Sequence, residues 1–452
     1  MLQLNSNLVA TVIVSSCNRR RHLERCLYSF SRQHGLERGS FEVVVADRGS
    51  SDGSQEMVRH LSMRMPYRLR LVTQASEDSG SAATENEALR LAEGSYLLLV
   101  DGDCVYPPTY LARQFRDQTH RTAWASDCVR LGQHETECIS TDAVCSGDFL
   151  TLVPRRLPTL LASRFRTDRI CQWLRHPSRP RFSGHNLAVW ADDLLSINGF
   201  DDSLSGWPMQ LEDLARRLRL FGIRIKTNAN RTFGYHLWHP VRDRSLSEGQ
   251  DQKASQYLGR SLVLPKCLNG MVKRTVHDLS VRVSASRACV SDVDWPTVVA
   301  LQENFVGSAS DDVNDIEGVE IEIRVNESPV SNAWKSAKRV QLTLDGRKTS
   351  RTAYKPHLVF DTQQVNELWQ RPTLKVFDPE QQDTTEPLNV GSHVAGESQP
   401  SHKGSGQVRR DGLDVSRWFL GELDRALSCR QDGSAATLMF SDLPSKDQRI
   451  AA

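Results

Sequence analysis

Three short apolar runs in the first hundred residues constrain the fold more than any other feature of the sequence. They cover residues 9–14, 41–46 and 96–100, and each is short and rich in branched residues, as buried strands are. Apolar residues at helical spacing follow the first run, which predicts a helix there. Residues 82–93 are predicted to form another helix, which ends at Gly94. Alternating strands and helices predict an α/β fold with a mostly parallel central sheet.

Acidic residues follow two of these strands directly. Asp47 closes the second strand, and Asp101 and Asp103 follow the third with one glycine between them. Ligands of open α/β sheets bind beyond the carboxyl ends of the strands, so we expect these carboxylates to share a site. Two carboxylates one residue apart can offer oxygen ligands to Mg²⁺ or Mn²⁺, although a simple turn would also explain the pair.

The net charge and the spacing of the cysteines indicate which partners and which cellular compartment to expect. The 57 basic and 55 acidic residues give a net charge of +2. The chain therefore lacks the large positive charge that would favour binding to nucleic acid. Ten cysteines without a CxxC pair predict reduced thiols in a cytosolic protein. Nothing resembles a signal peptide, and the apolar runs fall short of the ~20 residues that a membrane-spanning helix needs. We expect a cytoplasmic protein, either free or peripheral on the inner face of the membrane.

Four segments together resemble the family 2 glycosyltransferases, which have the GT-A fold. They are TVIVSSCNRRRHLERCLYSF, FEVVVADRGSSDGS, ENEALRLAEGSYLLLVDGDC and FSGHNLAVWADDLLSINGFDDSLSGW, within residues 8–240. Bacterial members that build lipopolysaccharide or capsule glycans are the most similar. The resemblance implies a GT-A, Rossmann-like nucleotide-sugar-binding domain at residues 1–245. It also implies metal-dependent, inverting transfer of a sugar from a nucleotide-sugar donor to a glycan or lipid-linked glycan.

The same resemblance assigns roles on the donor side. Asp47 corresponds to the acid that contacts the nucleotide base, and Asn18 and Arg48 join it among the donor-binding positions. Arg48 stands where the family usually has a second acid. Asp101 and Asp103 correspond to the motif that binds Mn²⁺ or Mg²⁺ and the diphosphate, with Asp103 as the direct ligand.

The acceptor side and the catalytic base are assigned in the same way. Asn186 and Trp207 correspond to the acceptor region, and His185 stands where cysteine is common. The family continues with a Glu-Asp pair and a second acid, but this chain reads GWPMQLEDLARRL. Asp213 takes the place of the second acid in an ungapped alignment, and a two-residue shift restores Glu212 and Asp213 as the pair. We expect Asp213 to be the base, with Glu212 next.

The displaced motif leaves a second hypothesis open. A chain that has lost its base would be a catalytically silent sugar or nucleotide-sugar binding protein, acting through its C-terminal region. His236 and His239, three residues apart in YHLWHP, could place both imidazoles on one side of a turn as metal ligands. A contact with the diphosphate is the alternative for these histidines.

Residues 151–182 carry eight arginines and one acid, Asp168, with leucines and aromatic residues between them. A solvated face explains this pattern, and so does a surface for anionic lipid or a phosphorylated, lipid-linked acceptor. No nucleic-acid recognition motif accompanies the arginines, so we expect no nucleic-acid partner.

The composition changes at about residue 246. Apolar residues alternate with charged or polar ones at 319–325 and 340–344, which predicts a small, half-exposed β-rich module at residues 246–378. Residues 379–412 are rich in Gly, Ser, Gln and Pro, which predicts a disordered linker. Residues 413–452 are expected to form a helix, over 413–427, and a tail.

Overall fold

A computed structural model of the chain describes most of the first 305 residues and several later strands. The described residues are 8–74, 81–116, 118–154, 156–173, 186–204, 207–228, 232–240, 262–292, 294–305, 320–326, 338–343, 358–361 and, within 419–427, short helical pieces. Two compact units divide the chain, Met1–Leu279 with Leu423–Gln431, and Ser280–Glu422 with Asp432–Ala452. Residues 262–279 thus group with the first unit, beyond the boundary expected at 245. The linker predicted at 379–412 lies outside the described residues.

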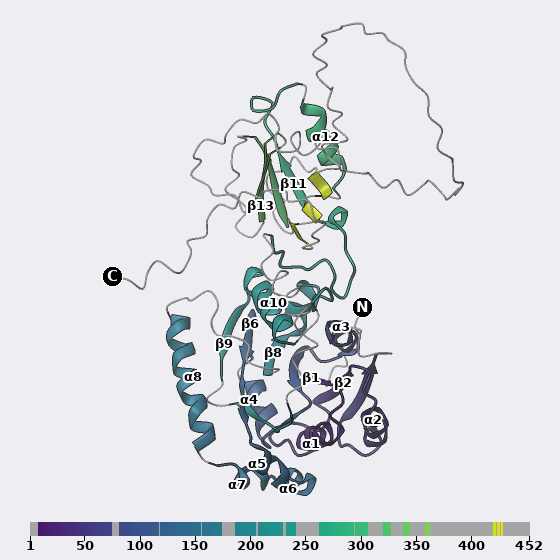
Figure 1. The fold of residues 1–452 in the computed structure, drawn as a ribbon, viewed down its shortest axis with the longest axis vertical. Helices are drawn as coiled ribbons and strands as arrows, with labels where there is room; N and C mark the ends of the chain where they lie inside the picture. The colour runs from purple at the N-terminus through teal and green to yellow at the C-terminus, as the bar shows by residue number, and fades with distance from the viewer. Residues whose placement is uncertain are drawn as a thin grey trace, which may run out of the picture. The chain divides into compact units, whose positions relative to one another are not determined.

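A seven-stranded sheet forms the centre of the first unit, in the order β3-β2-β1-β4-β8-β6-β9 (Figure 1). Its strands are β1 (Ala10–Ser16), β2 (Phe41–Asp47), β3 (Arg68–Thr73), β4 (Tyr96–Asp101), β6 (Thr122–Ala125), β8 (Asn186–Trp190) and β9 (Arg224–Thr227). Only β8 in this sheet runs in the opposite direction, since it pairs antiparallel with both β4 and β6. The predicted mostly parallel sheet is confirmed, and the carboxyl ends of β2, β1 and β4 lie side by side.

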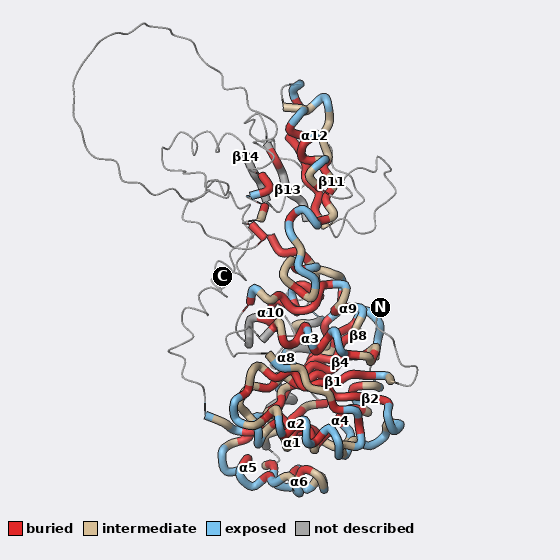
Figure 2. Tube along the Cα trace, turned by 90° about the vertical axis from the view of Figure 1, so that its right-hand side faces the viewer, coloured by how far each residue is buried: buried red, intermediate tan, exposed pale blue. Residues whose placement is uncertain are grey.

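Helices cover both faces of this sheet, because successive strand side chains point to opposite sides. Val12 and Val14 of β1 pack in one core cluster with α1 (Arg20–Ser31), α2 (Ser54–Ser62) and α4 (Tyr110–Arg116). Ile13 packs in a second cluster with α3 (Ser81–Leu91), α9 (Ala191–Ser196) and α10 (Trp207–Leu220). The strands β1, β2 and β4 are correspondingly buried along their length (Figure 2).

A smaller sheet, in the order β5-β10-β7, extends the first unit. It consists of β5 (Cys104–Val105), β7 (Asp127–Arg130) and β10 (Phe233–His236), and β10 pairs antiparallel with β5. The register sets His236 opposite Cys104. This pairing brings the segment after β10 to the carboxyl end of β4, although the two are far apart in the sequence.

Four helices lie between β7 and β8 in the described part of the chain. They are α5 (Gln133–Cys138), α6 (Thr141–Ser146), α7 (Phe149–Leu152) and α8 (Arg156–Trp173). No helix among the described residues combines the length and the apolar character needed to cross a bilayer.

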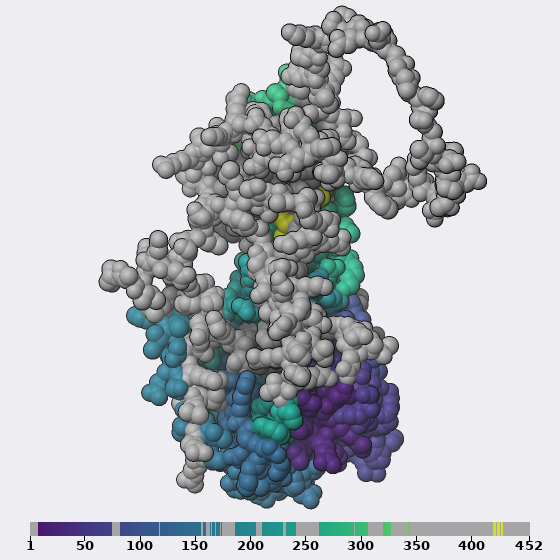
Figure 3. Space-filling model, in the orientation of Figure 1, coloured from purple at the N-terminus to yellow at the C-terminus, as the bar shows by residue number. Residues whose placement is uncertain are grey.

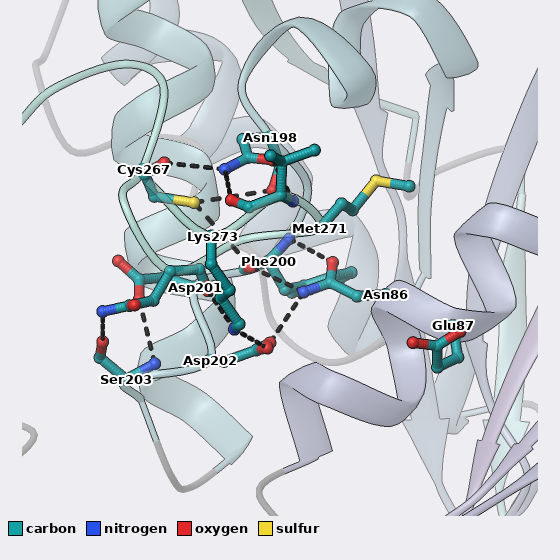
Figure 4. Close-up of polar contacts among 12 residues, drawn as sticks. Asn86, Glu87, Asn198, Phe200, Asp201, Asp202, Ser203, Cys267, Met271 and Lys273 are labelled. Carbon is teal, nitrogen blue, oxygen red and sulfur yellow. Dashed lines mark hydrogen bonds and ion pairs between the residues drawn. The ribbon is translucent and has the colours of Figure 1, made fainter. Parts of the chain in front are cut away.

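The loop after α9 is fixed from two sides by asparagine side chains (Figure 4). Asn86 on α3 donates to the carbonyl of Phe200 and accepts from its N–H, both at 2.9 Å. Asn198, held at a φ of +66°, donates to the carbonyls of Cys267 at 2.9 Å and Val272 at 2.8 Å. Its side-chain oxygen also accepts from the N–H of Val272 at 2.8 Å. The segment around residues 267–272 is therefore an integral part of this core.

Substitution of Asn86 by alanine should lower the free energy of unfolding by about 2 to 4 kcal/mol. The change leaves the buried N–H of Phe200 without a partner and its C=O with only the weak bond from Cys267 Sγ at 3.9 Å. An unsatisfied buried group of this kind costs about 1 to 3 kcal/mol. Urea unfolding measures the loss. The matched control is Gln133→Ala, which removes an exposed amide bonded to Glu137 and should change stability by less than about 0.5 kcal/mol. Equal effects of the two variants would contradict the prediction.

The second unit contains a four-stranded parallel sheet in the order β11-β12-β13-β14. Its elements are β11 (Val281–Ser284), α12 (Trp295–Glu303), β12 (Ile321–Val325), β13 (Lys338–Thr343) and β14 (Leu358–Asp361). Every residue of β12 is buried, including Glu322 and Arg324. The alternation predicted a half-exposed strand, and this prediction is wrong for β12. The strand is an inner strand of a parallel sheet, and such sheets are usually covered on both faces.

Candidate functional site

The carboxyl end of β4 forms a tight turn against β1. The N–H of Gly102 donates to the carbonyl of Ser15 at 2.9 Å. A Cβ at position 102 would lie 3.0 Å from that oxygen and 3.2 Å from the side chain of Leu23, so only glycine fits without displacement. The turn holds Asp101 and Asp103 at the end of the sheet.

Two histidines, one at the end of β10 and one three residues later, converge on Asp103. The Oδ2 atom of Asp103 lies 3.1 Å from Nε2 of His239 and 3.5 Å from Nε2 of His236. One ligand atom from each of the three residues falls within 4.8 Å of the others, as it does for the set Asp101, Asp103 and Cys104. One carboxylate and two imidazoles within this range are a donor set that a divalent cation could bridge.

The same groups perturb one another electrostatically. The hydrogen bond with Asp103 raises the pKa of His239, and it outweighs burial, which acts in the opposite direction. Burial alone would raise the pKa of Asp103, but the hydrogen bond with His239 and the charges of both histidines lower it below its usual value. The pair therefore favours a proton on His239 and a charge on Asp103. A bound cation would take the place of that proton.

The residue before α1 and the first turn of α1 contact the segment that carries His239. Arg19 Nη2 lies 3.2 Å from Nδ1 of His239, and His22 Nε2 lies 3.0 Å from the carbonyl of Trp238. Burial lowers the pKa of His22. The sequence reasoning missed Arg19 and His22. The signal that could have found them is the basic run NRRRH directly after the first strand.

Asp47 and Asn18 join the loops that follow β2 and β1. Asp47 is buried, and its carboxylate accepts from the N–H of Ser50 at 2.9 Å and from the side chain of Gln55 at 3.0 Å. The Asn18 side-chain oxygen accepts from the N–H of Ser51 at 2.8 Å. In this conformation both side chains are engaged in ordering the loop, rather than being open to a ligand.

Arg48 differs from these two residues. Its backbone N–H donates to Ser16 at 3.0 Å, and its Nε is enclosed without a hydrogen-bond partner among the described residues. An enclosed donor of this kind is costly unless a partner arrives. Arg48 as a whole is only partly buried, so a change of side-chain conformation would let its guanidinium meet a ligand at the ends of β1 and β2.

Asn186, expected on the acceptor side, is buried between two sheets. Its side-chain oxygen accepts from the hydroxyl of Tyr110 at 3.0 Å, and its nitrogen donates to the carbonyl of Asp127 at 3.2 Å. Both amide atoms are thus used internally. His185 lies outside the described residues. Trp207 begins α10, and its side chain is outside them as well.

The two acids expected to serve as base differ in environment. Asp213 is fully buried and accepts from Nε of Arg217 at 2.6 Å, while Nη1 of Arg217 donates to the carbonyls of Ile197 and Gly199. Burial opposes the charge on Arg217, but Asp213 raises its pKa above the usual value. An enclosed carboxylate in such a pair cannot meet an acceptor hydroxyl without breaking it. Glu212 is exposed.

Comparison with known proteins places this geometry in a family. Residues 11–135 match the sequence profile described as Glycosyl transferase family 2. The first unit contains a family 2 glycosyltransferase domain. This assignment agrees with the resemblance found in the sequence, and the α/β fold with its acidic strand ends agrees with it too.

Relatives of this glycosyltransferase domain extend beyond the matched segment. Validoxylamine A glucosyltransferase of Streptomyces hygroscopicus subsp. jinggangensis is 28% identical over 230 residues, covering 47% of this chain and 52% of the relative. Succinoglycan biosynthesis protein ExoA of Rhizobium meliloti is 25% identical over 198 residues, covering 43% and 53%. A solved mannosyltransferase, PcManGT of Pyrobaculum calidifontis with GDP-Man and Mn²⁺, has 22% identity and a TM-score of 0.37, covering 55% and 61%. The chain spans about half the length of the two curated relatives.

Proposed function

We propose that the protein is a metal-dependent, inverting glycosyltransferase that moves a sugar from a nucleotide-sugar donor to a glycan or lipid-linked glycan. The observation that carries the proposal is the convergence of Asp103, His236 and His239 at the carboxyl end of β4 in a family 2 domain. Open α/β sheets bind their ligands at this edge.

Asp103, His236 and His239 would hold the metal ion, with Asp101 beside them. Two imidazoles in the set favour Mn²⁺ over Mg²⁺, which prefers oxygen ligands and retains its waters. When bound, the ion supplies Lewis-acid stabilisation of the charge that develops on the departing diphosphate. Arg19, which contacts His239, adds a fixed positive charge on the same side.

The donor nucleotide would rest on the loops after β1 and β2. Asp47 and Asn18 hold these loops in shape, and the partly buried Arg48 would turn its guanidinium to donate to the nucleotide. The substitution of Arg48 for the usual acid adds a positive charge at this position. It suits a donor that presents an acceptor oxygen there.

Inversion requires a base on the face of the sugar opposite the diphosphate. Glu212 and Asp213 remain the candidates, and Glu212 takes precedence because its carboxylate is exposed while Asp213 is bonded to Arg217. Asp213 then positions α10 through Arg217 instead of touching the acceptor.

The biological setting we propose is the synthesis of a cell-surface polysaccharide. The name of the relative ExoA, which refers to succinoglycan biosynthesis, supports this setting. The described cysteines are all free thiols, which favours the reducing cytoplasm or the inner face of the membrane.

A catalytically silent sugar or nucleotide-sugar binding protein is the second candidate. The enclosure of Asp213 favours it, because the acid expected to act as base is used in a structural ion pair. This protein would bind the donor at the same strand ends and release no diphosphate.

The deciding experiment is donor hydrolysis by the purified full chain. Nucleotide sugars are offered one by one with Mn²⁺, with Mg²⁺ and with a chelator, and nucleoside diphosphate is measured. We expect release from one donor, faster with Mn²⁺ than with Mg²⁺ and absent with the chelator. Calorimetry on the same donors separates the two candidates, since binding without release identifies the silent protein. Neither binding nor release would overturn both.

A further inference from the structure

The helix α8 carries an exposed face that combines arginines with large apolar side chains. Arg166, Arg169, Ile170 and Trp173 follow one another at i, i+3, i+4 and i+7, so they lie on one side of the helix. Ile170 is 57% exposed and Trp173 is 82% exposed, and both arginines are exposed as well. The polar residues Thr159 and Ser163, also exposed, continue this face toward the N-terminal end of α8.

The other side of α8 packs on its own unit. Leu157 joins the core cluster that contains residues of β7 and β10, and α8 contacts β7 and β9. The helix stands at one side of the unit in Figure 1, and its atoms (blue, at left) are visible at the surface in Figure 3. Its 18 residues make it about 27 Å long. The exposed face therefore sits on a helix that the core holds in place.

The sequence segment that contains this helix has a strongly biased charge. Between Asp148 and Asp192 the sequence has eight arginines, no lysine and one acid, Asp168, a difference of +7. The whole chain has a net charge of +2, so the remainder is at −5. The positive charge of the protein is thus concentrated in the segment that contains α8.

We propose that this face of α8 docks the protein on an anionic lipid bilayer. The head groups would meet Arg166 and Arg169, while Ile170 and Trp173 enter the interface between the head groups and the acyl chains. Tryptophan favours that depth because its ring is apolar and its N–H is polar. A soluble polyanion would satisfy the arginines but leave both apolar side chains in water. The bilayer satisfies all four.

Vesicle binding by the full chain tests the proposal. The protein is sedimented with vesicles of phosphatidylcholine alone and of phosphatidylcholine mixed with phosphatidylglycerol. We expect binding to the mixed vesicles, falling as salt is raised. The double variant Arg166→Gln/Arg169→Gln should partition about twenty-five-fold more weakly, since each arginine near an anionic surface contributes about fivefold. Trp173→Ala should remove most of the tryptophan quenching by brominated lipid.

Matched controls use exposed residues on other elements. Arg38→Gln/Arg64→Gln removes two exposed arginines, and Met63→Ala removes an apolar side chain that is 80% exposed. Both should bind the mixed vesicles like the unchanged protein. No binding to mixed vesicles, equal losses in the controls, or full competition by inorganic polyphosphate without tryptophan quenching would each overturn the proposal. Donor hydrolysis without vesicles reports on the transferase site separately, and the α8 variants should leave it unchanged.

Discussion

Replacing Asp103 with asparagine should lower metal-dependent release of nucleoside diphosphate about a thousandfold. Asp103 is the residue that both proposed metal-ligand sets share, and the histidines converge on its carboxylate. Loss of the negative charge weakens binding of the cation, and the stabilisation that the bound cation gives to the leaving group is worth several kcal/mol. The rate is measured at saturating donor over a range of Mn²⁺ concentrations, alongside Mn²⁺ calorimetry.

Two further variants show whether the effect arises at the metal. His239→Ala should weaken Mn²⁺ binding by more than about a hundredfold, since loss of an outer-shell partner alone typically costs about ten- to a hundredfold. Partial activity should remain at high Mn²⁺, because the other proposed ligands remain. Asp142→Asn, which changes an exposed acid on α6, should change neither quantity. The metal assignment fails if Asp103→Asn binds Mn²⁺ as tightly as the unchanged protein.

Replacing Arg217 with methionine should lower the free energy of unfolding by about 3 to 5 kcal/mol. The change leaves the carboxylate of Asp213 buried without its partner, which is the costly case for an internal ion pair. It also removes the donors to the carbonyls of Ile197 and Gly199. Denaturant unfolding followed by circular dichroism measures the loss.

A double variant and a neighbouring acid complete this test. Asp213→Leu combined with Arg217→Met removes both charges and should recover a large part of the lost stability, because no buried charge remains unpaired. Glu212→Gln should leave stability within about 0.5 kcal/mol, since Glu212 is exposed, but should reduce transfer if it is the base. If the Asp213→Asn variant is well folded but inactive, the base is Asp213 and not Glu212.

Local patterns predicted β1, β2 and β4, three of the seven strands, because these are short, apolar and followed by a turn. The other strands were not predicted, since segments such as RLRLVT and RIKT carry charged residues along their length. The helix α1 was equally clear, since Leu23, Cys26, Leu27 and Phe30 recur at helical spacing and are all buried. The strand-end carboxylates also followed from local sequence. The meeting of Asp103 with His236 and His239 needed the topology of a parallel sheet and the pairing of β10 with β5.

Other features depend on packing that no local pattern records. Asp213 and Arg217 stand four apart, which predicts an ion pair on a helix, but their burial depends on α10 packing against the loop after α9. Glu322 and Arg324 alternate with apolar residues as on the outer face of a strand, yet both are buried in β12, which pairs with β11 and β13 at its two edges. Arg48 was assigned from the family pattern, whereas its unpartnered Nε could be found only in the structure.

The bonds of Asn198 bear on where the transferase part of the chain ends. Its partners Cys267 and Val272 lie well beyond the family match at 11–135 and beyond the expected boundary at 245. The loop they fix carries the carbonyls that bind Arg217, and Arg217 in turn anchors α10. A chain shortened to residue 245 would therefore keep every proposed metal ligand. It would lose the partners of Asn198, which fix the loop that binds Arg217 of α10. We therefore expect the smallest autonomous folding unit to extend beyond residues 11–135, the segment that matches the family profile.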